Sequence, residues 1–68
     1  MIKKLILNEG ISNTLFMSLL EEIIQSKNED EGTKILYRED GVDMSYQREK
    51  ITWRQHEILF DLFNRIYG

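Results

Sequence analysis

The stretch TKILYREDGVDMSYQREK, residues 33–50, decides the fold that the sequence predicts. Its centre, Asp40-Gly41, is typical of a two-residue type I′ turn, in which both turn positions need a positive φ. Such a turn fixes the register of two strands and places Arg38 opposite Asp43 on one face. The other face would carry the large apolar side chains Ile35, Tyr37, Val42, Met44 and Tyr46. The turn residues and the alternation agree, so the sequence predicts a β-hairpin over residues 33–50.

An amphipathic helix is predicted on each side of this hairpin. Over residues 12–27, apolar residues recur every three or four positions, and Ser12 is a plausible N-cap. A second helix is predicted from Trp53 to about Tyr67. It would begin at a capping box, in which the Thr52 hydroxyl and the Gln55 side chain satisfy each other's backbone N–H groups.

Residues 2–7 allow two interpretations. Ile2, Leu5 and Ile6 fit one face of a helix, whereas the brevity of the segment and its branched residues favour a strand beside the hairpin. With a strand here, residues 1–68 form a single α+β domain in the order β-α-β-β-α. Its two helices would pack on one face of a two- or three-stranded, mostly antiparallel sheet. The alternative is α-β-β-α with a disordered or helical start.

Composition excludes several classes of function. The chain has 68 residues, nine Lys+Arg, twelve Asp+Glu, one His and no Cys, so a disulfide and a zinc site of the usual kind are excluded. His56 has no cysteine or second histidine with which to build a catalytic pair, and no glycine-rich phosphate loop is present. We therefore expect no catalytic activity, metal or cofactor. The acidic residues 28–31 are interpreted as a solvated loop.

Apolar patterning also bears on location. The longest uninterrupted apolar run, residues 5–7, has three residues, which is too short to span a membrane or to form the core of a signal peptide. We therefore expect a cytoplasmic protein that does not enter membranes.

One edge of the last predicted helix is the strongest sign of a binding surface. Trp53, Phe60 and Tyr67 are spaced by seven and fall within roughly 40° of one another on the helix. With His56 they belong to an apolar arc of roughly 220°, wider than the rest of so short a chain would cover. Exposed aromatic stripes mark interfaces. The sequence thus predicts a small regulatory or adaptor protein that uses this edge to bind another protein or a second copy, as a homodimer.

A nucleic-acid-binding accessory factor for transcription is the alternative function. Basic residues gather in the hairpin and at the start of the last helix, and a β-ribbon can enter a groove of DNA. These residues are Lys34, Arg38, Arg48, Lys50 and Arg54. The net charge of −3 disfavours this alternative, because binding to phosphates rests on clustered positive charge.

Overall fold

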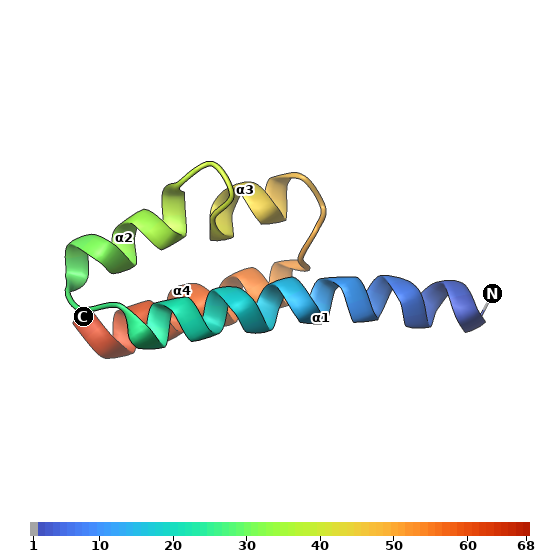
Figure 1. Ribbon diagram of the computed structural model, residues 1–68, viewed down its shortest axis with the longest axis horizontal. Coiled ribbons are helices and arrows are strands. Elements are labelled where there is room, and N and C mark those ends of the chain that lie inside the picture. Colours follow the sequence, from blue (N-terminus) through green and yellow to red (C-terminus); the bar gives the residue numbers. More distant parts are fainter. Residues whose placement is uncertain (1) are drawn as a thin grey trace.

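The computed structural model describes the backbone of residues 2–68 and the side chains of residues 13–68. Four helices follow one another in this part of the chain, and it contains no strand (Figure 1). They are α1 (Ile2–Gln25), α2 (Glu29–Tyr37), α3 (Val42–Gln47) and α4 (Trp53–Tyr67). The predicted α+β class is therefore wrong, and the fold is helical.

Helices α1 and α4 lie side by side and run in the same direction. Gln55 Nε2 at the start of α4 donates to Asn13 Oδ1 of α1 over 3.3 Å, and the Tyr67 hydroxyl at its end donates to the Ser26 carbonyl over 3.2 Å. Helices α2 and α3 together cover one side of this pair, and the N-terminal half of α1 projects beyond the other helices (Figure 1).

The core lies where α2 and α3 cover the α1–α4 pair. Side chains from all four helices and from the segment before α4 contribute to it, and Phe16, Leu62 and Phe63 pack around it. Its buried members are Leu19, Ile23, Ile35, Leu36, Val42, Ile51 and Leu59. Gly32 lets α2 approach α4 closely, because a Cβ at this position would lie 2.8 Å from Cε1 of Phe63.

The predicted first strand of the hairpin is the second half of α2. The acidic residues interpreted as a loop form its first turn, where carboxylates favour helix formation. Asn28 is the N-cap: its Oδ1 accepts from the Glu31 N–H over 2.9 Å, and the Glu31 carboxylate accepts from the Lys27 N–H over 2.9 Å. The buried residues of α2 are spaced by three and one, as on a helix face, and Tyr37 is 59% exposed.

The predicted turn at Asp40-Gly41 joins two helices instead of two strands. Gly41 has φ −87°, so the positive φ of a type I′ turn is absent, and this residue is the N-cap of α3. A glycine is nevertheless required, because a Cβ here would lie 2.3 Å from the Ile35 carbonyl oxygen. The predicted Arg38–Asp43 pair is also wrong, since Arg38 contacts Glu22 and Asp40.

The prediction is wrong for the first segment of the chain and correct for the last. Residues 2–7 belong to α1, so the strand predicted there is wrong, and Ser12 lies inside this helix instead of capping it. Helix α4 confirms the prediction for residues 53–67. Its capping box is present: Thr52 Oγ1 accepts from the Gln55 N–H over 3.1 Å, and Gln55 Oε1 accepts from the Thr52 N–H over 3.0 Å.

Candidate binding surface

The aromatic edge predicted as a binding surface faces α2 and α3. The Trp53 ring lies 5.3 Å from that of Tyr46 on α3, and the Phe60 ring lies 5.8 Å from that of Tyr37 on α2. Tyr67 hydrogen-bonds Ser26, after the end of α1. Of the predicted edge only Trp53, at 57%, is exposed, while Phe60, Tyr67 and His56 are partly buried. A role of this edge in partner binding stays a prediction.

His56 is packed among aromatic rings. It stacks between Trp53 and Phe60, with ring centroids at 5.1 and 4.5 Å, and the Tyr46 ring is tilted against it at 5.0 Å. Its side chain is 13% exposed, and Nε2 lies 3.4 Å from Asp43 Oδ1. Both ring nitrogens are buried and neither makes a hydrogen bond. These contacts give the imidazole a packing role at the junction of α3 and α4.

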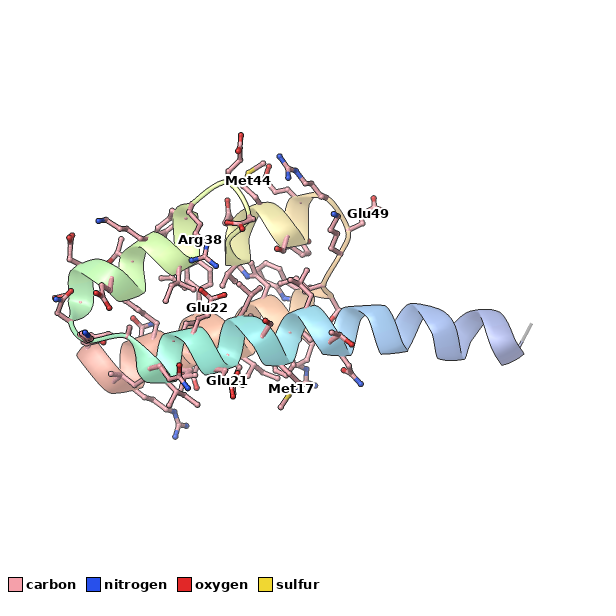
Figure 2. All side chains as sticks on the ribbon, in the orientation of Figure 1. Met17, Glu21, Glu22, Arg38, Met44 and Glu49 are labelled. Carbon is pink, nitrogen blue, oxygen red and sulfur yellow. The ribbon has the colours of Figure 1, made fainter. Side chains whose placement is uncertain are left out.

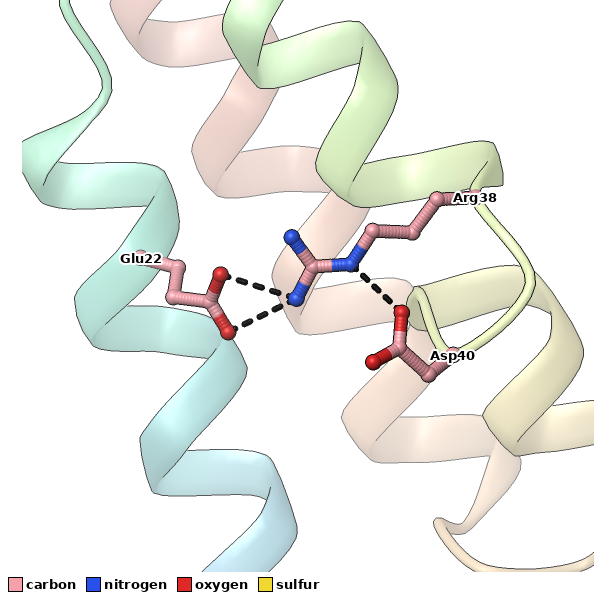
Figure 3. A network of polar contacts seen from close by, with 3 residues as sticks. All are labelled: Glu22, Arg38 and Asp40. Carbon is pink, nitrogen blue, oxygen red and sulfur yellow. Dashed lines mark hydrogen bonds and ion pairs between the residues drawn. The ribbon is translucent and has the colours of Figure 1, made fainter.

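Arg38, one of the predicted basic residues, is held between two carboxylates (Figure 3). Its Nη2 donates to both carboxylate oxygens of Glu22 over 2.8 Å, and its Nε lies 2.8 Å from Asp40 Oδ1. Burial alone would lower the pKa of Arg38, but the hydrogen bonds and charges of Glu22 and Asp40 outweigh it and raise the pKa. This guanidinium ties α2 to α1 and is neutralised within the fold.

The other predicted basic residues do not form one continuous positive patch. Arg48 and Lys50 line a shallow pocket of about 90 Å³ together with the acidic residues Glu39 and Asp40. Exposed basic side chains also stand on α2 and α4, at Lys34 and Arg54. Carboxylates thus lie among the basic groups, and the structure adds no support to nucleic-acid binding.

A different surface exposes large apolar side chains. Met17 and Ile24 on α1 are each 56% exposed, and Ile58 and Ile66 on α4 are 40% and 44% exposed. Partly buried leucines lie between them in the sequence, one on each helix. We call this surface the open face and define it by Met17, Leu20, Ile24, Ile58, Leu62 and Ile66.

The register of the two parallel helices places these residues beside one another. The hydrogen bonds that join α1 to α4 link residues 42 and 41 positions apart. An offset of 41 sets Met17 level with Ile58, and an offset of 42 sets Leu20 level with Leu62 and Ile24 level with Ile66. Three apolar pairs therefore follow the seam between α1 and α4.

The open face lies on the side of the α1–α4 pair away from α2 and α3. Met17 points away from those helices, whereas Glu22 points toward Arg38 (Figure 2). On α4, Ile58 is two residues before Phe60, which packs on Tyr37, and two residues correspond to roughly 200° around a helix. A shallow groove of about 420 Å³ follows α1 here, and its lining includes Met17, Leu20, Ile24 and the neighbouring Glu21.

One signal in the sequence pointed to this surface. The apolar arc of α4 is too wide for one buried side, and the sequence predicts that the excess lies at the aromatic edge. The aromatic margin is instead occupied by α2 and α3, so the excess falls on Ile58, Leu62 and Ile66. Met17, Leu20 and Ile24 belong to the apolar residues that recur over residues 12–27, and the predicted α+β fold would bury that side of the helix against a sheet.

No family model, no curated protein and no solved structure matches the chain. None of the helices described is long and apolar enough to cross a membrane. Among the side chains of residues 13–68, no group of three His, Asp or Glu is placed to hold a metal ion.

Proposed function

We propose that this chain is a non-catalytic protein-binding module, a regulatory or adaptor protein of the cytoplasm, and that the open face is its binding surface. The observation that supports this most is the exposure of Met17, Ile24, Ile58 and Ile66 on one side of two adjacent helices. Proteins that remain monomeric rarely expose a continuous apolar surface of this kind without a use for it.

The free energy available from covering the open face is substantial for so small a chain. Fully burying one Ile or Met side chain contributes about 1.5–3 kcal/mol, and the four exposed side chains are each roughly half exposed. Covering all four would therefore contribute about 3–6 kcal/mol, before the entropic cost of association.

The open face is also held in a fixed shape. Leu19, Ile23 and Leu59 are buried directly behind it, and hydrogen bonds join α1 to α4 at both ends of the shared length. A rigid surface loses little conformational entropy when a partner covers it, which favours binding.

An immobilised chain tests this proposal in extract of the source cell. We expect the parent to retain a specific partner and Ile24→Glu to lose it, because the substitution places a charge in a desolvated contact. Trp53→Glu is the matched control, since Trp53 is equally exposed but lies on the aromatic edge. Retention by Ile24→Glu together with loss by Trp53→Glu would contradict the proposal and identify the aromatic edge as the binding surface.

Methionine oxidation gives a second readout on the unmodified chain. Met17 lies on the open face, whereas Met44 lies on α3, on the opposite side of the molecule (Figure 2). Bound partner should slow the oxidation of Met17 by peroxide and leave Met44 unchanged, because oxidation follows exposure. Equal protection of the two residues, or protection of Met44 alone, would refute the open face as the site.

A further inference from the structure

We propose that the partner on the open face is a second copy of this chain, and that the two-fold axis of the dimer runs parallel to α1 and α4. Helix α1 of each copy would then pack on α4 of the other. This inference rests on the proposed function and adds to it the identity and orientation of the partner.

The apolar pairs along the seam make the open face self-complementary in this orientation. A two-fold axis parallel to the helices keeps every residue at its own level and exchanges α1 with α4. Met17 would then face the partner's Ile58, Leu20 the partner's Leu62, and Ile24 the partner's Ile66. Each level of the interface would hold two copies of one apolar pair, which closes the face on itself, as a two-fold interface requires.

Charges at the two margins of the open face also fit this orientation. Glu21 borders the α1 margin, and Arg65 is exposed on the α4 margin, next to Ile66. The offsets of 41 and 42 set Glu21 level with Leu62 or Phe63, two or three residues before Arg65, or about 3–4.5 Å along the helix. Opposite charges would therefore meet twice per dimer. Arg65 Nε also lies 3.0 Å from Asp61 Oδ2 on the same helix. An exposed ion pair of this kind contributes little free energy, so Arg65 can exchange it for the partner's Glu21.

The other two-fold orientation, with the axis perpendicular to the helices, is disfavoured by the same residues. Its centre would lie midway between the levels of Met17 and Ile24, which is the level of Leu20 and Glu21. The two Glu21 side chains would then approach each other at the centre of one margin. Like charges juxtaposed across an interface cost free energy, so the parallel orientation is favoured.

Single-cysteine variants distinguish the two orientations, because the chain has no native cysteine. Glu21→Cys and Arg65→Cys would be treated with a short bismaleimide, each alone and as an equal mixture. Our proposal predicts covalent dimers in the mixture and few in either variant alone, since residues 21 and 65 meet only across copies. Strong cross-linking of Glu21→Cys with itself would overturn the parallel orientation.

Charge reversal measures the contribution of the margins without any label. Glu21→Arg should weaken the dimer about tenfold, because two exposed pairs are lost, and adding Arg65→Glu should restore it. Glu57→Arg is the matched control, since Glu57 is exposed on α4 roughly 140° around the helix from Leu62. An equal effect of Glu57→Arg, or no restoration in the double variant, would contradict the pairing.

Light scattering over a dilution series separates failure of this inference from failure of the proposed function. A chain that stays monomeric at every concentration refutes self-association. If Ile24→Glu still abolishes capture of a partner from the extract, the proposed function stands. A dimer that is insensitive to Ile24→Glu would refute the dimer through the open face, because association would then use another surface.

Discussion

Replacement of Gly41 by alanine adds one methyl group where the start of α3 packs against the backbone at the end of α2. The new Cβ would lie 2.3 Å from the Ile35 carbonyl oxygen, 3.0 Å from the Arg38 oxygen and 3.1 Å from the Arg38 nitrogen. An ordinary contact between carbon and oxygen is about 3.3 Å, so the backbone must separate by about 1 Å. Alanine readily adopts φ −87° and ψ −164°, so crowding is the main source of cost, and the loss of a favoured N-cap residue of α3 adds to it.

The crowding sets the size of the expected loss. Overpacking costs about 1–3 kcal/mol, and backbone atoms yield less than side-chain tips, so we expect Gly41→Ala to lose about 2–3 kcal/mol. A core of this size supplies about 3–5 kcal/mol in total. The ratio of folded to unfolded chains should therefore fall about 30- to 150-fold, and the thermal midpoint should fall by about 8–24 °C.

Circular dichroism during thermal and urea unfolding measures both quantities. Gly32→Ala is the matched control: its Cβ would lie 2.8 Å from Phe63 Cε1 and 2.9 Å from Tyr67 Cε2, which belong to rings that can move. It should cost less, because alanine also recovers up to about 1 kcal/mol of helix propensity. Gly41→Asn distinguishes this fold from the hairpin, since asparagine suits a type I′ turn. A Gly41→Asn or Gly41→Ala variant as stable as the parent would refute the reasoning.

Two further predictions concern the ends of helices. Glu49 follows α3 with φ 61°, where its N–H donates to the Tyr46 carbonyl and the next N–H to the Ser45 carbonyl, a position that favours glycine. Glu49→Gly should therefore raise the free energy of unfolding by about 0.5–1 kcal/mol in urea, and a loss of stability would contradict the left-handed geometry. Thr52→Ala should cost about 1 kcal/mol by removing the N-cap of α4, whereas Thr33→Ala, inside α2, should cost less; equal midpoints would refute the role of the cap.

Local signals explain why the sequence predicts α4 correctly and why it wrongly predicts a hairpin over residues 33–50. The Thr52–Gln55 capping box lies within four consecutive residues and needs no tertiary contact, so the sequence alone indicates it. Asn28 and Glu31 carry a similar signal for α2, but their acidic neighbours also suit a loop. Asp40-Gly41 then favoured a hairpin, although the glycine is required for close packing against the Ile35 carbonyl.

The sequence predicts that α4 leaves apolar surface uncovered, but it does not predict which margin of the helix this is. The width of the apolar arc on α4 indicated that some apolar surface stays uncovered, and the exposure of Ile58 and Ile66 agrees with that inference. Which margin stays uncovered depends on where α2 and α3 pack. That choice follows from contacts such as Gly32 against Phe63, which join residues far apart in the chain and leave no periodic pattern.

The open face is uncovered because α2 and α3 are short. A parallel pair of helices has two sides to cover, and each added helix shields only a stripe of it. Helices of nine and six residues suffice for one side of the α1–α4 pair, and the part of the chain described contains no further element for the other side. The same apolar side chains that give α1 and α4 their contact therefore continue onto the uncovered side. In the proposed dimer each copy would supply this second layer for the other, and covering the four exposed side chains of one copy would contribute about 3–6 kcal/mol before the entropic cost of association. Folding and binding would then draw on one continuous apolar surface, so the free energy of unfolding should rise with the concentration of the chain.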